Sequence, residues 1–324
     1  MKHLLDIDAA KEIARLTDWI RDVTFGRHGR KGAIVAISGG IDSSVVAALC
    51  VRALGPKKVL GLMLPETESS DDNANLAKLL ADRIGLEAIT ESITPLLEAT
   101  GCYRRRDEAI KKLIPDYQPD WKSKIVLPSV VDSDAYRLFS VVAQAPDGTQ
   151  HKARLTHAAF LEIVAATNFK QRARKMIEYY HADRLNYVVT GTPNLLEYDQ
   201  GFFVKLGDGA ADLKPIAHLY KTQVYALAAA LEIPKEISSR PPSTDTYSLP
   251  QTQEEFYFSL PYDQMDLCLY ARDHQLAAAD VAAALGRTPE QIERVFRDID
   301  AKRKMARYLH SPPLLIDSQN QPSG

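Results

Sequence analysis

The chain has 324 residues, of which 45% are hydrophobic and 25% are charged, as in an ordinary soluble globular protein. Its 40 basic and 42 acidic residues give a formal net charge of −2, which argues against general nucleic-acid binding. No apolar run is long enough to span a membrane, no signal peptide is evident, and the three cysteines are too far apart in sequence to indicate a disulfide framework or a structural zinc site, so we expect a cytoplasmic protein.

Predicted helices and strands alternate in the first part of the chain. Amphipathic spacing predicts a helix over 4–25, and short apolar runs predict strands over 33–37, 59–64 and 86–93. A helix with serine and aspartate at its start is expected over 71–84. This alternation is typical of an α/β fold in which helices cover both faces of a parallel, twisted sheet.

A glycine-containing loop, Ser38-Gly39-Gly40-Ile41-Asp42-Ser43-Ser44, connects the first strand to a helix expected over 45–54. The glycines let the backbone turn, and the helix start then directs N–H groups and the positive end of its dipole at one place, which suits phosphate. Asp42 fits such a site only if a cation lies between it and the phosphates. A simple helix cap is the alternative, but seven suitable residues in a strand–turn–helix setting favour a phosphate site. No lysine follows the glycines as in a P-loop, and the segment resembles the pyrophosphate-binding loop of the ATP pyrophosphatases.

Residues 101–155 interrupt the alternation. Arg104-Arg105-Arg106 is expected to be a solvated charge cluster, and Pro146-Asp147-Gly148 is a strong turn signal between strand-like arms at 136–145 and 149–155. We interpret the segment as an inserted β-hairpin. Because its arms are apolar, we hypothesise that it covers the active site or extends a dimer interface.

Three motifs surround a fourth strand expected at 186–190. A basic run, 168–176, comes just before an expected helix at 177–183, and Gly191-Thr192-Pro193-Asn194-Leu195-Leu196-Glu197 follows the strand. The third motif, 205–212, places charged side chains around glycine turns. Alone, each could be a solvated face, a helix cap or an ordinary loop. Ligands of parallel sheets bind at the carboxyl ends of the strands, so the turn at 190–192 and the Ser38 loop should lie together.

In this order, the motifs resemble the NAD synthetase family, from about residue 32 to 231 apart from the insertion and more weakly to about 305. The resemblance implies ATP-dependent adenylation of nicotinic acid adenine dinucleotide, with Mg²⁺, and then attack by ammonia to give NAD and AMP. It also implies a synthetase domain over 1–260 with an adenine-nucleotide α-hydrolase-like fold and a helical extension over 261–310. A flexible tail is expected over 311–324, and the protein is expected to be a homodimer.

The resemblance assigns roles to individual residues. ATP is expected to contact Ser38, Gly39, Gly40, Ile41, Asp42, Ser43, Ser44, Thr192, Lys221 and Ser243. Mg²⁺, which prefers one or two carboxylates plus phosphate oxygens, is assigned to Asp42 and Glu197. The dinucleotide is assigned to Arg174, Lys205, Asp212 and Lys302. The catalytic candidates are Lys221, which should neutralise phosphate charge, and Asp208, which should steer or deprotonate ammonium; a turn role between two glycines is nearly as favoured for Asp208.

Two positions depart from the family pattern. Gln253 stands where an aspartate is usual, and Ala301 precedes Lys302 where a histidine or tyrosine is usual. We expect both departures to affect the substrate end of the site. We expect no glutaminase domain before the first strand, so ammonia should be free or come from a separate glutaminase.

Two other functions remain possible from the residues. One is a different adenylating ATP pyrophosphatase, either tRNA-modifying or similar to GMP synthetase. A tRNA-thiolating enzyme should show a basic face or catalytic cysteines, and neither is clear in this sequence. The other is a nucleotide-binding paralogue without turnover, against which Asp42, Glu197 and Lys221 argue.

Overall fold

A computed structural model of the protein describes residues 1–127, 138–242, 246–258 and 260–316. Its central sheet has four parallel strands in the order β3-β2-β1-β7. The strands are β1 (Ala33–Ala36), β2 (Val59–Met63), β3 (Glu87–Thr90) and β7 (Val188–Thr190). The expected parallel α/β fold is therefore confirmed.

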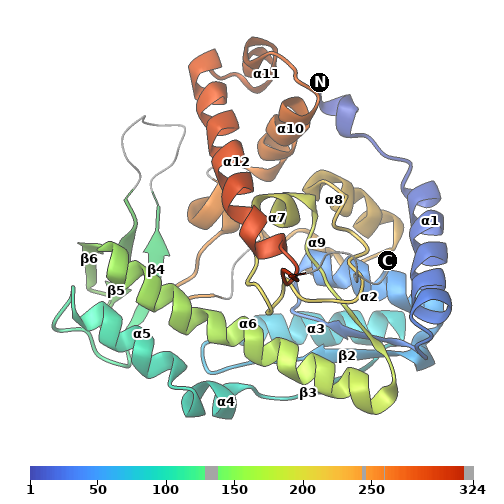
Figure 1. Ribbon diagram of the computed structural model, residues 1–324, viewed down its shortest axis with the longest axis horizontal. Coiled ribbons are helices and arrows are strands. Elements are labelled where there is room, and N and C mark those ends of the chain that lie inside the picture. The colour runs from blue at the N-terminus through green and yellow to red at the C-terminus, as the bar shows by residue number, and fades with distance from the viewer. Residues whose placement is uncertain (128–137, 243–245, 259, 317–324) are drawn as a thin grey trace.

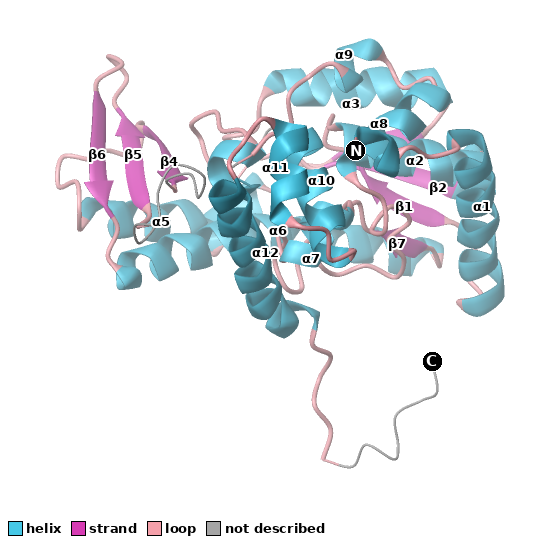
Figure 2. Cartoon of the chain, turned by 90° about the horizontal axis from the view of Figure 1, so that it is seen from above, coloured by secondary structure: helices cyan, strands magenta, loops and turns pink. Residues whose placement is uncertain are grey.

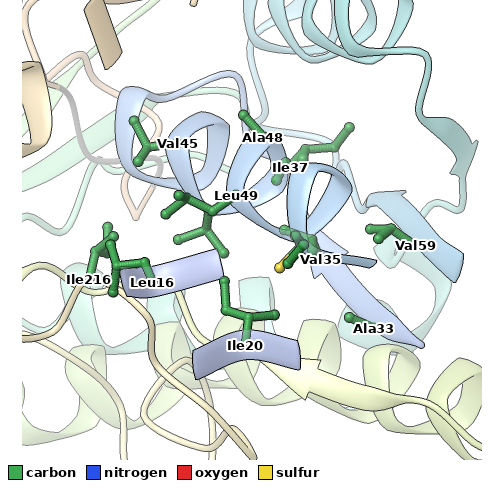
Figure 3. Close-up of a cluster of buried hydrophobic side chains, with 14 of the residues drawn as sticks. Leu16, Ile20, Ala33, Val35, Ile37, Val45, Ala48, Leu49, Val59 and Ile216 are labelled. Atoms are coloured by element: carbon green, nitrogen blue, oxygen red, sulfur yellow. The ribbon is translucent and has the colours of Figure 1, made fainter. Parts of the chain in front are cut away.

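Helices cover both faces of this sheet (Figure 1). One face carries α1 (Ala9–Arg21), α2 (Ile41–Leu54), α3 (Asp71–Ile84) and α8 (Lys221–Ala230), and the other carries α4 (Thr94–Ala99), α5 (Cys102–Lys111) and α6 (His157–Leu185). Alternate β1 side chains enter different cores, since Ala33 and Val35 face α1 and α2 whereas Ile34 faces α6. Figure 3 shows the first core, in which Leu16 and Ile20 lie near Leu49.

Helix α6 is much longer than the sequence pattern predicted. It has 29 residues, contains no glycine or proline, and is capped at its start by Thr156, whose hydroxyl accepts a hydrogen bond from the Ala159 amide. The basic run 168–176 is thus part of this helix, and the expectation that it precedes a separate helix was wrong. Within it, Arg172 is exposed whereas Lys170 and Lys175 are buried.

The insertion is also larger than the predicted hairpin. After α5 it forms an antiparallel sheet, β4-β5-β6, from Lys122–Val126, Ser140–Gln144 and Gln150–Arg154. The predicted turn does join two strands, because Gly148 has a φ of 89° and the Asp147 carboxylate accepts a hydrogen bond from the Thr149 amide at 2.8 Å. Residues 136 and 137 of the first arm lie outside the described residues. Figure 2 shows this sheet to one side of the parallel sheet.

The charge cluster in the insertion is only partly solvated. Arg104 pairs with Glu108 on the exposed side of α5, as expected. Arg106 is 3% exposed and forms a 2.6 Å ion pair with Glu68 from the loop after β2, so the expectation was wrong for this residue. This helix carries both exposed and buried arginines, and composition alone cannot distinguish such a helix from a run of solvated charges.

The C-terminal part is helical, as predicted. It contains α10 (Tyr262–Asp273), α11 (Ala278–Leu285) and α12 (Pro289–His310), and the short helices α7 (Leu195–Gln200) and α9 (Lys235–Ser238) precede it. Leu196 of α7 shares an apolar core with α10, α11 and α12, so these helices fix the position of the motif that follows β7. Short 3-10 helices occur at Lys2–Leu5 and Pro56–Lys58, and short π-helical segments occur at Asp22–Arg27 and Glu254–Phe258. None of the helices in the described parts is both long and apolar enough to cross a membrane.

Candidate active site

The loop after β1 has the backbone that a phosphate site requires. Gly39 has a φ of 79°, and a Cβ atom there would lie 2.5 Å from the Asn73 carbonyl oxygen. Gly40 is the N-cap of α2, and its carbonyl accepts the hydroxyls of Ser43 at 3.0 Å and Ser44 at 2.8 Å. These bonds hold the first turn of α2 against the loop, and its N–H groups point at one place.

Two carboxylates and one ammonium group meet beside this loop. Lys221 of α8 is fully buried and donates a hydrogen bond to Asp42 Oδ2. Asn194 donates its side-chain amide to Asp42 Oδ1 at 3.3 Å and its backbone N–H to Glu197 Oε2 at 3.2 Å. The N-cap of α7 therefore connects the two carboxylates that the sequence assigned to a metal.

The electrostatics of this group favour an additional cation. Burial, and then the nearby Asp42 carboxylate, raise the pKa of Glu197 to about 8. Burial alone would lower the pKa of Lys221, but Asp42 and Glu197 outweigh it and raise that pKa. No group of three or more potential metal-ligating side chains occurs in the described ranges. Two carboxylates that share one cation fit Mg²⁺, since that ion completes its shell with water and phosphate oxygens.

Gln253 belongs to this same group. Its side-chain amide donates to Glu197 Oε1 at 3.2 Å, and the Tyr262 hydroxyl donates to its carbonyl oxygen. We expected this departure to affect the substrate end of the site, but the structure places it on a candidate metal ligand. A neutral amide there adds no negative charge to a pair that is already difficult to ionise.

A cavity of about 840 Å³ opens from the phosphate loop. The predicted site residues on its wall are Ser38, Gly39, Gly40, Ile41, Asp42, Ser43, Arg174, Thr192, Glu197, Asp208, Lys221 and Lys302. Ser44 is fully buried behind the loop, with its hydroxyl bonded to Gly40, and Ser243 lies outside the described residues. The parts of the site that the sequence placed on three separate motifs thus share one cavity.

Asp208 lies in a second charged region of the cavity wall. Its carboxylate accepts a 2.8 Å hydrogen bond from the Val204 amide, and burial raises its pKa. Lys175 and Glu178 of α6 form a buried ion pair of 2.7 Å whose charges act on Asp208, and both line the cavity. Arg174, which precedes Lys175 in α6, donates a hydrogen bond to the carbonyl of Leu64, just after β2. The sequence did not identify Glu178 as a residue of the site.

The other residues assigned to the dinucleotide are held by bonds within the protein. Lys205 lies outside the cavity lining and donates to the Tyr308 carbonyl at 2.8 Å near the end of α12. Asp212 also lies outside it and accepts the Val189 amide at 2.7 Å. Lys302 does line the cavity and donates to the Tyr257 carbonyl at 2.6 Å. Substrate binding by these residues stays a prediction.

A buried charge network at the cavity wall was not predicted from the sequence. Lys170 is 2% exposed, and its ammonium group donates to Glu66 at 2.9 Å and to Glu68 at 2.6 Å. It also bonds the Thr246 carbonyl at 3.3 Å, while Arg106 of the insertion pairs with Glu68. If α6 is taken over its full length, the helical spacing of its apolar residues indicates that Lys170 lies on the buried side.

Comparisons with known proteins agree with these observations. The protein-family model for NAD synthase matches residues 12–114 and 136–308. A protein of Mesorhizobium japonicum, named NH(3)-dependent NAD(+) synthetase, is 55% identical over 96% of this chain and 98% of its own length. Proteins with the same name from Rhizobium meliloti and Thermotoga maritima are 56% and 34% identical, over 96% and 90% of this chain and 93% and 94% of their own.

Solved structures share the fold at lower identity. An NH3-dependent NAD synthetase from Campylobacter jejuni superimposes with a TM-score of 0.63 at 22% identity, covering 96% of this chain and 100% of that one. An NMN synthetase from Francisella tularensis gives 0.64 at 23% identity, covering 96% and 99%. At such identities the likeness shows the fold alone.

Proposed function

This chain belongs to the NAD synthase family, and from that premise we propose that it is an ammonia-dependent NAD synthetase. The reaction would convert nicotinic acid adenine dinucleotide, ATP and ammonia into NAD, AMP and pyrophosphate. One observation supports the proposal beyond family membership. The Lys221–Asp42 pair and Glu197 lie beside the glycine loop after β1, whose backbone suits a phosphate group. Family membership also favours this activity over tRNA modification or a GMP-synthetase-like reaction.

In the first step, a nicotinate carboxylate oxygen attacks the α-phosphorus of ATP, and pyrophosphate leaves. Negative charge gathers on the leaving phosphates, so preorganised donors supply most of the stabilisation. We assign this role to the N–H groups around Gly39 and Gly40, to the Ser38 and Ser43 hydroxyls, and to the Lys221 ammonium group. We also assign Thr192, which follows the carboxyl end of β7 and lines the cavity, to the nucleotide.

In the second step, ammonia attacks the activated carbonyl carbon and AMP leaves. Ammonium must lose a proton before its nitrogen can attack. Asp208 is our candidate acceptor because it lines the cavity and because burial raises its pKa, which makes its carboxylate a stronger base. Arg174 lies on the same wall and is assigned to the dinucleotide.

Mg²⁺ is part of the proposal. Asp42 and Glu197 would hold it, and when bound it would neutralise charge on the ATP phosphates. The support is the donor set itself, two carboxyl groups beside the phosphate loop, one of which, Asp42, pairs with the Lys221 ammonium group.

We further propose a homodimer that forms through the exposed side of α6. Leu161, Met176 and Tyr180 are 49%, 55% and 59% exposed and lie along one side of this helix, where a second copy would cover them. The helices after residue 260 are proposed to extend the synthetase domain, because they share a core with α7. A cytoplasmic location is also proposed, since Cys50, Cys102 and Cys268 are free thiols.

The test is a turnover assay with ATP, Mg²⁺, ammonium and nicotinic acid adenine dinucleotide, in which NAD and AMP are measured together. We expect both products in equal amounts. No NAD above background would reject the function, and AMP without NAD would indicate adenylation of another acceptor. A parallel assay with glutamine and no ammonium should give no NAD unless a separate glutaminase is added.

A further inference from the structure

Arg240 follows α9 and lines the cavity, and the sequence did not identify it as a residue of the site. Ile237 of α9 is 2% exposed in the core that also contains α2, so this core holds the short helix in place. After Arg240, Pro241 and Pro242 have fixed φ angles, and the Pro242 carbonyl accepts a hydrogen bond from the Gln253 amide at 3.4 Å. The backbone on both sides of Arg240 is therefore anchored, beside α3 (Figure 2).

The Arg240 guanidinium group lies close to the phosphate loop. Its Nη1 atom donates a 2.7 Å hydrogen bond to Asn73 Oδ1, on the first turn of α3. The backbone carbonyl of the same asparagine lies against Gly39, where a Cβ atom would be only 2.5 Å from the carbonyl oxygen. Arg240, Asn73 and Gly39 all line the cavity. Asn73 therefore connects the guanidinium group to the glycine turn whose backbone suits phosphate.

The positive charge of Arg240 is not used in an ion pair. The four lysines of the cavity wall each pair with a carboxylate: Lys175 with Glu178, Lys221 with Asp42, Lys302 with Asp298, and Lys170 with Glu66 and Glu68. The two arginines of the wall, Arg174 and Arg240, form no ion pair within the described parts of the chain. Arg174 is already assigned to the dinucleotide, so Arg240 is the cation without a role.

A guanidinium group in this position suits phosphate oxygens. It carries five N–H donors in a planar fork, which can bind two oxygens of a phosphate at once. Among the described residues, only the bond to Asn73 Oδ1 uses a side-chain donor of Arg240. Arg240 is only partly buried and lines the cavity, so its other donors are available to a ligand there. Asn73 fixes the orientation of the fork and, as a neutral amide, leaves its charge unbalanced.

Resting on the proposed function, we infer that Arg240 is a further catalytic residue of the adenylation step. Its guanidinium group binds the β- and γ-phosphates of ATP while it keeps its hydrogen bond to Asn73. When a nicotinate oxygen attacks the α-phosphorus, the bond from that phosphorus to the bridging oxygen breaks, and pyrophosphate leaves with the electron pair. The charge of Lys221 is already shared with Asp42, whereas Arg240 brings a positive charge that no described carboxylate balances.

The test separates contacts to the outer phosphates from contacts to the rest of the nucleotide. We would measure dissociation constants of ATP, pyrophosphate and AMP by calorimetry, together with kcat for NAD formation, in the wild type, Arg240→Met and Arg240→Lys. Methionine keeps an apolar stem and removes the charge, whereas lysine keeps the charge and removes the planar fork. Arg83→Met is the matched control, because Arg83 is also beside the end of a helix of this face, pairs with Glu232 at the surface and does not line the cavity.

We expect Arg240→Met to bind ATP and pyrophosphate about 10- to 100-fold more weakly, as for the loss of hydrogen bonds to a charged group, and to bind AMP like the wild type. Unchanged AMP binding also shows that the variant is folded. Its kcat should fall, and Arg240→Lys should recover part of both losses. In Arg240→Ala, added guanidinium ion at millimolar concentration should restore part of the activity. The control should match the wild type throughout.

Two results would overturn the inference. One is an unchanged affinity of Arg240→Met for both ATP and pyrophosphate. The other is an equal weakening of ATP and AMP binding, which would mean that Arg240 only supports the cavity wall. A wild type that binds ATP and pyrophosphate but makes no NAD would instead reject the proposed function, and the three dissociation constants would still test Arg240.

Discussion

Lys221 on α8 forms a buried ion pair with Asp42 on α2, across 179 positions of the chain. Together with the hydrogen bond from Asn194 to Asp42, this pair joins the second half of the chain to the phosphate loop. Because the partly buried Glu197 lies beside this pair, one ammonium group faces two carboxyl groups, and the pKa of Glu197 is raised. The site therefore lacks the positive charge that would ionise Glu197 before a cation binds.

Replacing the ammonium group should expose this shortage. In Lys221→Met, Asp42 and Glu197 lose their shared cation, and we expect kcat to fall at least about 100-fold. Loss of one partner of a buried pair should also cost about 3–5 kcal/mol of unfolding free energy. Mg²⁺ should raise the melting temperature of the variant more than that of the wild type. If Mg²⁺ raised the melting temperatures of variant and wild type equally, Lys221 would not be the group that balances these carboxyl groups. Lys57→Met, at an exposed site, is the control.

The stability of the metal-free protein should depend on the protonation of Glu197. Its folded pKa of about 8 lies above the usual 4.5, so the folded state holds an extra proton between these values. Stability from this group is thus lost as pH rises through that window, by at most about 1.4 kcal/mol per pH unit. We expect Glu197→Gln to unfold like the wild type near pH 4.5 and to be the more stable protein near pH 8. Urea titrations at several pH values test this, with exposed Glu98→Gln showing no such trend.

The two loop glycines should respond differently to alanine. Gly39→Ala forces a side chain into a φ of 79° and against the Asn73 carbonyl, whereas a Cβ atom at Gly40 meets only the Ser38 hydroxyl at 3.3 Å. We expect Gly39→Ala to lose roughly 1–3 kcal/mol of stability relative to Gly40→Ala, with a higher KM for ATP. Chemical denaturation and steady-state kinetics provide the comparison. An equal loss of unfolding free energy in both variants would show that the loop backbone can adjust to a side chain at position 39 without strain.

Lys170 should act mainly on stability. Lys170→Met leaves Glu66 and Glu68 facing each other in a buried network, and we expect a loss of about 3–5 kcal/mol in unfolding free energy. Adding Glu66→Gln should recover part of that loss, because one buried charge is removed. Denaturant unfolding of the single and double variants measures the coupling. If the double variant were less stable by the sum of both single losses, Lys170 and Glu66 would not be coupled.

A charge on the exposed side of α6 should prevent dimer formation. Tyr180→Glu places a carboxylate where we propose that a second copy packs, and the species in solution should change from a dimer to the 36.0 kDa monomer. Light scattering coupled to size exclusion measures this mass. Leu79→Glu, on the outer side of α3, should leave it unchanged. A dimer that persists in Tyr180→Glu would place the interface elsewhere.

The sequence predicted best where structure depends on neighbouring residues. The strand, glycine turn and helix start around Gly39 follow from local dihedral preferences, and the structure confirms them. The prediction failed along 168–176, where basic residues suggested a separate solvated segment. Residues such as Lys170 are buried there because their partners, Glu66 and Glu68, come from a distant loop, and no local pattern reveals that pairing.

The sequence by itself determined the parallel α/β fold and the strand, glycine turn and helix start of the Ser38 loop, because these depend on local backbone preferences. The choice of Asp42 and Glu197 as candidate metal ligands came from the resemblance of the motifs and stays a prediction. Only the tertiary structure decided that Gln253 contacts Glu197, that Lys205 bonds the end of α12, and that the insertion contributes Phe139 to the cavity. Those contacts join segments far apart in the chain, and their geometry is fixed by packing between helices rather than by the residues beside them.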